Sequence, residues 1–408
     1  MAGHVETVVI GAGQSGLAVS YCLTQRNRTH VVLEKHRIGE AWRSGKWESF
    51  TLVTPNFTLN LPGFPYQGDD PDGFLTRAEV VRYLEDYVSQ FAPPVQTGIT
   101  VTAVRPIADG FTVETDMGEY TASNVVVATG AFQKPRLPMF AVRIDPDILQ
   151  LHSSQYRNPD LLPPGAVLIV GSGQSGCQIA YELRQAGRKV YLSTGKAGRA
   201  PRIYRGREIF HWLTEMGFFD RTTAQLQSEA ERFAPNPQLT GRDGGKSLNL
   251  HEFARDGVTL LGRLVDGSQT SLTFAPDLAT NLTAMDRMET EITKAIDGYI
   301  ERAGIQAPPP QLPHLRDGYD TEILTQLDTA EAGITAIVWA CGYAFDYGWI
   351  HAPVLDERGY PIHHRGVTRV PGLYFVGLQW LHKTQSSLFL GVAEDAEFIS
   401  EHIAGRGM

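Results

Sequence analysis

The sequence predicts an α/β fold in which one chain carries two Rossmann-like dinucleotide-binding domains. Residues 11–16 read Gly-Ala-Gly-Gln-Ser-Gly and residues 171–176 read Gly-Ser-Gly-Gln-Ser-Gly, so the same glycine pattern occurs twice. Each copy follows a short apolar run and precedes a segment with helical spacing of apolar residues. One such pattern is weak evidence, but two in a strand–turn–helix context indicate two nucleotide sites. Enzymes of this kind commonly pass electrons from one nucleotide to the other.

The first unit begins with an apolar strand at 8–10, passes through the glycine turn into a helix at 14–26, and returns as a strand at 31–33. Glu34 stands at the end of that second strand. A carboxylate in this place accepts both ribose hydroxyls of an adenine nucleotide. A solvated strand end is the alternative interpretation, and the position of Glu34 after the glycine turn argues against it.

Further helix and strand signals lie between the two patterns. The expected elements are a helix at 76–91 and strands at 99–104, 111–115 and 125–127. Thr76 is the expected N-cap of the helix, and Glu79 completes a capping box. The last strand ends in the small-residue turn Ala128-Thr129-Gly130. The stretch 133–146 contains several prolines and predicts a crossing between domains.

The second unit repeats the first, with one difference at the end of its second strand. Its expected elements are a strand at 167–170, a helix at 174–186 that Gly187 closes, and a strand at 189–192;. The strand ends at Ser193-Thr194 and not at an acid. The basic residues that follow are Lys196, Arg199, Arg202, Arg205 and Arg207. Hydroxyl and basic side chains suit the 2′-phosphate of NADP, and a solvated basic loop is the alternative interpretation.

The rest of the chain predicts a nested arrangement. Residues 203–330 are interpreted as the remainder of the second domain with an insert. Strands are then expected at 334–339 and 373–377, and a final helix from Ser386 or Ser387 through Phe398. The first domain is therefore expected to resume after the second. The predicted boundaries are 1–158 and 330–408 for the first domain and 159–329 for the second.

Composition limits the function classes. The chain has 408 residues, 42% of them hydrophobic, and a net charge of −9, which argues against a nucleic-acid-binding surface;. Its three cysteines, Cys22, Cys177 and Cys341, form no Cys-x-x-Cys, so neither a redox dithiol nor a thiolate zinc site is expected;. No other metal site is expected. With no leader pattern and no membrane-spanning run, we expect a cytoplasmic protein with reduced thiols.

At these motifs the chain resembles flavin-dependent monooxygenases of the two-dinucleotide-binding-domain type. That group includes flavin-containing monooxygenases, plant auxin-forming enzymes and Baeyer–Villiger monooxygenases. Besides both glycine patterns, the resemblance rests on Glu34, Ala128-Thr129-Gly130 and Ala340-Cys341-Gly342-Tyr343. Residues 152–157, which include His152 and Tyr156, match the tail of the family signature, whereas Pro146 and Ile148 replace the Phe and Gly of its head. The stretches 52–56, 61–66 and 241–245 resemble a narrower bacterial family of flavin-dependent oxidoreductases encoded near nitrilases.

The resemblance implies FAD in the first domain and NADPH in the second. The residues implied at FAD are Gly11, Ala12, Gly13, Gln14, Ser15, Gly16, Glu34, Lys35, Trp42, Arg43, Trp47, Val101, Ala128, Thr129, Gly130, Gly377 and Gln385. The residues implied at NADPH are Gly171, Ser172, Gly173, Gln174, Ser175, Gly176, Ser193, Thr194, Lys196, Arg199 and Arg202. If the final helix begins at Gln385–Ser387, its positive end would face the flavin.

The resemblance also implies a reaction. NADPH would reduce FAD, and a C4a-peroxyflavin would then transfer one oxygen atom to a small substrate at a soft nitrogen or sulfur or at a carbonyl carbon. Asn56 is the candidate catalytic residue over the flavin, and a turn asparagine is the alternative interpretation. A reductase or oxidase without oxygen insertion and a non-catalytic flavoprotein stay open as alternative functions. The expected partners are a small molecule and O2, without nucleic acid or membrane, and a homodimer is left open.

Overall fold

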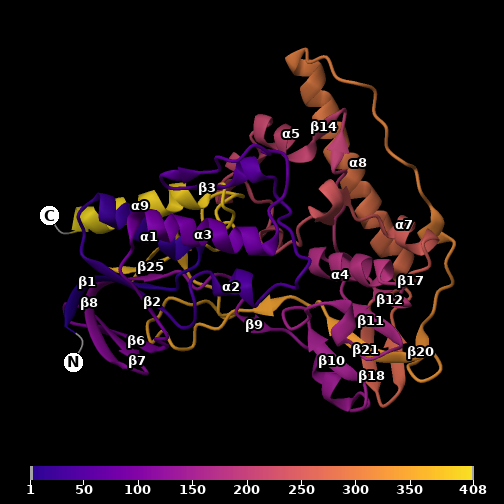
Figure 1. Cartoon of the computed structure of the whole chain (residues 1–408), viewed down its shortest axis with the longest axis horizontal. Helices are drawn as coiled ribbons and strands as arrows, with labels where there is room; N and C mark the ends of the chain where they lie inside the picture. The colour runs from indigo at the N-terminus through magenta and orange to yellow at the C-terminus, as the bar shows by residue number, and fades with distance from the viewer. Residues whose placement is uncertain (1–2, 407–408) are drawn as a thin grey trace.

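The computed structural model describes residues 3–406, in which two sheets lie side by side along the long axis of the molecule (Figure 1). The first sheet is assembled around β1 (His4–Ile10), which pairs in parallel with β2 (His30–Glu34) and β8 (Gly118–Val127). Helix α1 (Gln14–Gln25) connects β1 to β2, and β25 (Leu373–Phe375) extends the sheet beyond β8. Because these strands run parallel, their carboxyl ends meet at one edge, where ligands bind in sheets of this kind.

Further elements complete the first unit. They are α2 (Glu40–Arg43), α3 (Arg77–Phe91), β3 (Asn60–Leu61), β4 (Phe64–Pro65), β5 (Val95–Thr97), β6 (Val101–Ile107), β7 (Gly110–Thr115), β23 (His363–His364), β24 (Val367–Thr368) and α9 (Val392–Arg406). The predicted capping box of α3 is present, because Thr76 accepts from the Glu79 N–H and Glu79 accepts from the Thr76 N–H. Helix α9 packs against α1 on one face of the sheet (Figure 1).

The second sheet has five parallel strands. In order they are β10 (Leu149–His152), β21 (Ile334–Trp339), β11 (Ala166–Val170), β12 (Val190–Ser193) and β17 (Thr259–Leu261). Helix α4 (Gln174–Gln185) connects β11 to β12, and Gly187 follows its end with φ of +75°. The predicted α/β fold, with one Rossmann-like unit inserted in the other, is confirmed.

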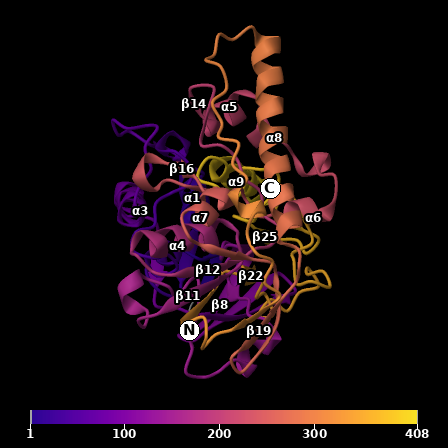
Figure 2. The same cartoon turned by 90° about the vertical axis from the view of Figure 1, so that its right-hand side faces the viewer.

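Other elements surround the second sheet. They are β9 (Lys134–Pro135), β13 (Ile203–Tyr204), β14 (Arg207–Glu208), α5 (Ile209–Glu215), α6 (Glu229–Arg232), β15 (Leu239–Thr240), β16 (Lys246–Ser247), α7 (Leu250–Arg255), β18 (Leu264–Ser268), β19 (Ser271–Phe274), α8 (Leu278–Ala303), β20 (Gln326–Asp328) and β22 (Tyr343–Ala344). Helix α8 rises above the sheet beside α5 and β14 (Figure 2). No helix within residues 3–406 has the length and apolarity to cross a bilayer.

Strands β10 and β21 belong to the second sheet, although their residues fall within the ranges predicted for the first domain. The strand expected at 334–339 forms as β21, but it pairs with β11 and β10 in the second sheet. A run of apolar residues indicates a strand without revealing which sheet it joins, because pairing partners lie far away in the sequence. We therefore propose that the chain crosses between the units within 128–148 and 340–372, which would move the boundaries predicted at 158 and 329.

The prediction for the start of the last helix is wrong. Residues 384–391 form consecutive turns, and α9 begins only at Val392. Its first turn already contains Glu394 and Asp395, which complement the positive end of the helix;. The helix end therefore does not lie at Gln385–Ser387.

Candidate functional site

Each glycine pattern folds into a tight turn. Its first and last positions can be occupied only by glycine. Gly11 and Gly171 have φ of +106° and +107°, a conformation that other residues rarely adopt;. A Cβ on Gly16 or Gly176 would overlap the carbonyl oxygen of the first glycine of the same turn. The repeated sequence therefore produces the same close approach of helix and strand in both units.

The middle glycine of each turn faces open space at a helix N-terminus. Gly13 and Gly173 are the N-caps of α1 and α4, with φ of −85° and −70°. A Cβ on either residue would meet no atom within 4 Å. Neither helix has a capping side chain or an acidic residue in its first turn. Free N–H groups at an uncapped helix start bind anions, so both turns fit the pyrophosphate of a dinucleotide.

Loops after neighbouring strands close around the turns. A Cβ on Gly11 would lie 2.8 Å from the Ala128 carbonyl oxygen, and one on Gly171 would lie 2.5 Å from that of Ala340. Thr129 and Gly130 follow Ala128 in the same loop, where the Gln133 amide donates to the Thr129 hydroxyl at 2.8 Å. The predicted turns 128–130 and 340–342 thus occupy equivalent places beside the two glycine patterns.

The returning segment of the first unit also contacts the first turn. Gly377, with φ of +78°, approaches Ser15 so closely that a Cβ would overlap the serine hydroxyl. The Gln14 amide donates to the Ser387 carbonyl at 2.9 Å. The structure therefore brings Gly377 and the segment that contains Gln385 next to the first glycine pattern.

Glu34 is held at the carboxyl edge of the first sheet. Its carboxylate accepts from the backbone N–H groups of Ala12 and His36, each at 2.8 Å. Its own carbonyl accepts from the N–H of Ile99 at 3.0 Å, which brings the segment before Val101 alongside. Lys35 beside it is exposed. Glu34 lies between the glycine turn and the strand that begins at Val101, as an adenosine site requires.

The corresponding edge of the second sheet has no acid, and the two hydroxyl residues predicted to bind there already have hydrogen-bond partners. Ser193 is buried, donates to the Gly262 carbonyl at 3.0 Å and accepts from the Leu264 N–H. Thr194 is buried and donates to the Leu261 carbonyl at 2.8 Å. Both hydroxyls tie β12 to the end of β17, so neither is free to bind a phosphate.

The predictions that Arg199 and Arg202 hold the phosphate are not supported either. Arg199 is 4% exposed and forms ion pairs with Asp286 at 2.7 Å and Glu289 at 2.8 Å. Arg202 lies beside Glu208, at 3.3 Å, and donates to the Val53 carbonyl at 2.8 Å. Arg199 is already neutralised by its two acid partners, because leaving a buried charge unpaired would be costly;.

Two other basic residues remain at this edge of the second sheet. Lys196 is exposed and has no ion pair among residues 3–406. Arg263, which the sequence analysis missed, follows β17, and its side chain is 68% exposed beside Asp277. Ser172 and Gln174 shape the turn itself, through bonds to Gly195 and Pro237, and Ser175 lies in the first turn of α4.

The two tryptophans predicted at the flavin lie in different places. Trp42 is near the first glycine turn, and Trp47 is near the boundary with the second unit. Trp42 stacks on Phe389, with ring centres 5.8 Å apart, and its loop is joined to the first turn by the bond from the Gly39 N–H to the Ala12 carbonyl at 3.0 Å. Arg43 pairs with Glu85. Trp47 is buried at the boundary with the second unit, where it lies near Tyr156.

Lys46 is a candidate functional residue that the sequence analysis missed. Its ammonium group lies over the rings of Trp42, Phe50 and Phe132, at 5.8, 5.1 and 5.4 Å from their centres. Lys46 has no acid partner among residues 3–406, and burial lowers its pKa to about 8. A single lysine within the aromatic segment 42–50 was the only sequence signal. The cage places a positive charge near the carboxyl edge of the first sheet.

Asn56, the predicted catalytic residue, is hydrogen-bonded at both ends of its side-chain amide. It is 3% exposed, donates from Nδ2 to the Asp70 carbonyl at 2.9 Å and accepts at Oδ1 from the Leu75 N–H at 2.9 Å. Both ends of the amide therefore fasten the loop 70–75 to the start of a 3₁₀ turn at 56–58. The alternative interpretation of a turn asparagine is favoured.

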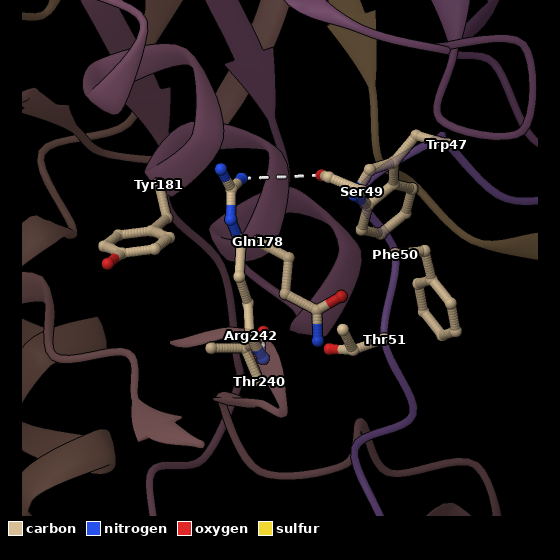
Figure 3. A pocket seen from close by; sticks show the side chains of 8 residues that line it. All are labelled: Trp47, Ser49, Phe50, Thr51, Gln178, Tyr181, Thr240 and Arg242. Atoms are coloured by element: carbon tan, nitrogen blue, oxygen red, sulfur yellow. Dashed lines mark hydrogen bonds between the residues drawn. The ribbon is translucent and has the colours of Figure 1, made fainter. Parts of the chain in front are cut away.

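A polar network joins the two units. Glu182 of α4 accepts from Ser49 at 2.5 Å and from Tyr156 at 2.8 Å, and Arg242 lies 3.6 Å away. Figure 3 shows the narrow gap beside this network, which Ser49 and Arg242 help to line. Arg242 also donates a hydrogen bond to Ser49 there. The gap measures about 10 Å³, too small for a ligand;. Tyr156 of the family signature is thus part of the hydrogen-bond network that joins the two units.

His152 of the same signature has polar partners at both ring nitrogens. Its Nε2 lies 3.1 Å from the Gly342 carbonyl and its Nδ1 lies 2.9 Å from the Ser154 hydroxyl, and Tyr343 packs on the ring. Burial lowers the pKa of His152, so the neutral ring is favoured;.

Comparison with known proteins gives similarities over most of the chain. The model of the pyridine nucleotide-disulphide oxidoreductase family matches residues 8–213. The chain is 35% identical to the uncharacterized oxidoreductase CzcO-like of Geobacillus kaustophilus, over 98% of each chain. It is 30% identical to indole-3-pyruvate monooxygenase YUCCA1 of Oryza sativa, over 45% of this chain and 46% of the relative. The solved flavin-containing monooxygenase from Stenotrophomonas maltophilia has a TM-score of 0.68 and 20% identity, with both chains covered completely.

Proposed function

Because the chain belongs to the pyridine nucleotide-disulphide oxidoreductase family, we propose that it is an FAD- and NADPH-dependent monooxygenase. The family assignment confirms the resemblance and makes the chain an oxidoreductase. The names of YUCCA1 and of the Stenotrophomonas protein support a monooxygenase. We further propose that one atom of O2 is inserted into a small substrate, at a soft nitrogen or sulfur or at a carbonyl carbon.

The observation that carries the proposal is the pair of open glycine turns with different strand ends. The first turn lies beside the carboxylate of Glu34, which would accept the ribose hydroxyls of FAD;. The second turn has no acid at its strand end and an exposed Lys196 nearby, which suits the additional phosphate of NADPH;. Gly13 and Gly173 leave room for the two pyrophosphates. The residues present therefore fit both groups.

When bound, FAD supplies the hydride acceptor and the centre that reacts with O2. The chain's own contribution is binding and orientation. The free N–H groups of α1 and α4 would neutralise the pyrophosphates, and Trp42 would shield the flavin side of the first site;. The ammonium of Lys46 would stabilise the negative charge of the reduced ring system;.

We expect Lys196→Ala to raise the KM for NADPH about 10-fold and to leave the KM for NADH unchanged. The reason is that only NADPH carries the phosphate that Lys196 would bind. Steady-state NADPH and NADH oxidation measures both values. Lys294→Ala, which removes an exposed lysine on α8, is the matched control. Equal changes with both coenzymes would contradict the assignment of Lys196.

We expect Lys46→Met to lower the midpoint potential of the bound flavin at pH 7 by roughly 20 mV, equal to about 1 kcal/mol for two electrons. The cause is the loss of a positive charge that favours the reduced form. Because the pKa of Lys46 is about 8, the difference between variant and wild type should vanish above about pH 9. Lys134→Met, an exposed lysine, is the control. Equal potentials at pH 7 would contradict a role for Lys46 at the flavin.

The thiols do not favour a reductase that uses cysteines of its own. Burial raises the pKa of Cys22 and of Cys177 far above the usual value, and raises that of Cys341 to about 11. A thiolate is the reactive form, so these cysteines are poor redox groups. A reductase that passes electrons to a quinone or to O2 without insertion is the second candidate, because the head of the family signature is missing.

Rapid mixing separates the two candidates. The protein is reduced anaerobically with NADPH and then mixed with O2 while the flavin absorbance is recorded. A transient spectrum that differs from both oxidised and reduced flavin supports the monooxygenase. Direct return to the oxidised spectrum contradicts it and supports the reductase or oxidase.

A further inference from the structure

A cleft outside both glycine turns has the features of a separate ligand site. It has a volume of about 420 Å³ and opens between Phe74, the segment 202–211 and Gly244. This volume suits a small organic molecule. Phe74 and Ile203 form its apolar wall. Its charged lining residues are Asp72, Arg202, Arg207, Glu208 and His211.

Arg202 has unused hydrogen-bond donors in this cleft. The residue is 3% exposed, and its guanidinium lies 4.0 Å above the Phe74 ring. Nη2 donates to the Val53 carbonyl at 2.8 Å, whereas Nε and Nη1 have no hydrogen-bond partner among residues 3–406. Buried N–H groups without acceptors cost free energy, about 1–3 kcal/mol each. Nε faces only the Glu208 carboxyl group, at 3.3 Å, so the donor at Nη1 in particular points to an anionic ligand.

Glu208 stands next to these donors with one unused oxygen. Its Oε2 accepts from the Phe210 N–H at 2.6 Å, but Oε1 has no hydrogen-bond partner in the described part of the chain and lies 3.3 Å from Arg202 Nε. Burial raises the pKa of Glu208 to about 7, although Arg202 and the Phe210 N–H oppose the shift. A carboxyl group with this pKa is readily protonated and can then donate.

The other charged groups around Glu208 already have partners. His211 lies 2.6 Å from Asp72, and Arg207 pairs with Glu215. Within residues 3–406, the buried polar atoms of the cleft that lack a hydrogen-bond partner belong to Arg202 and Glu208.

Two stretches that carry the narrower family resemblance meet at this arginine. The stretch 52–56 supplies the Val53 carbonyl that orients Arg202. The stretch 241–245 ends in Gly245, where a Cβ would lie 2.9 Å from Arg202 Nε. Glycine at 245 therefore leaves room for the guanidinium, and neither stretch contributes to the two glycine turns.

We propose that this cleft is a binding site for a small organic carboxylate, held by Arg202 and by protonated Glu208. The carboxylate oxygens accept from the free N–H groups of Arg202 and from the Glu208 hydroxyl, and the apolar body of the ligand lies against Phe74 and Ile203. Binding to the ionised form of Glu208 would place two carboxylates together, so the site takes up one proton there as the ligand binds. The inference concerns binding and does not depend on oxygen insertion.

Calorimetric titration of the wild-type protein with phenylacetate between pH 6 and 9 tests the proposal, with neutral phenylacetamide as the matched probe. Phenylacetate should bind and phenylacetamide should not. The dissociation constant should rise about 10-fold for each pH unit above roughly 7, since one proton is taken up. Equal binding of both probes, or no binding of phenylacetate, overturns the proposal.

Two variants locate the binding energy. Glu208→Gln keeps a donor without a charge and should make phenylacetate binding independent of pH. Arg202→Met should abolish phenylacetate binding. Arg207 lines the same cleft, but Arg207→Met should leave this binding intact. If Arg202→Met does not fold, the pH dependence of phenylacetate binding to Glu208→Gln still tests the proposal. An unchanged pH dependence in Glu208→Gln overturns the proposal. So does a raised KM for NADPH in Arg202→Met with phenylacetate binding intact, because the cleft would then belong to the coenzyme.

Discussion

Replacing Gly173 by leucine should give a protein that keeps its yellow flavin but is no longer reduced by NADPH. Gly173 has φ of −70°, which leucine adopts freely, and its Cβ would meet no atom within 4 Å. The variant should therefore fold, while the side chain fills the place of the coenzyme pyrophosphate. We expect the rate of flavin reduction at a fixed NADPH concentration to fall by roughly 100-fold, equal to about 2.8 kcal/mol. Anaerobic stopped-flow absorbance measures this rate.

Gly348→Leu is the control for this experiment. Gly348 is exposed, and a Cβ there would also meet no atom within 4 Å. That variant should reduce at the wild-type rate. Unimpaired reduction of Gly173→Leu would contradict the placement of NADPH at the second turn, and loss of the flavin would show that the turns are not independent.

Gly13→Leu should purify without flavin. Gly13 is in an extended conformation with open space at its Cβ, so the change should leave the fold intact and exclude the pyrophosphate of FAD. We expect the affinity of the apoprotein for added FAD to fall by roughly 100-fold or more, about 2.8 kcal/mol. Fluorescence quenching of FAD measures the affinity, and circular dichroism checks the fold.

Gly16→Ala provides the contrast for Gly13→Leu. A Cβ on Gly16 would overlap the Gly11 carbonyl oxygen, so this variant should lower the free energy of unfolding as well as flavin binding;. A folded Gly13→Leu variant that binds FAD as the wild type does would contradict the assignment of the first turn.

The sequence was sufficient for the parts of the site that depend on neighbouring residues. The two glycine turns, the helices after them and Glu34 are specified within segments of about 30 residues each, and the backbone geometry of the turns permits few alternatives;. The capping box at Thr76 and Glu79 was predictable for the same reason;.

Features that depend on distant partners were not predictable from the sequence. Arg199 is neutralised by Asp286 and Glu289, about 90 positions later, so a nearby run of basic residues said nothing about its role. The cage of Lys46 is completed by Phe132, which only the fold brings near. The sheet to which β21 belongs depends likewise on long-range pairing.

We propose that one chain binds FAD at its first glycine turn and accepts electrons there from NADPH bound at its second. Anaerobic titration of the purified wild-type protein with NADPH tests it most directly. We predict that one equivalent of NADPH bleaches one FAD per chain, and that Gly173→Leu requires a large excess. Flavin that stays oxidised with excess NADPH, or a protein that binds no FAD, would contradict the account.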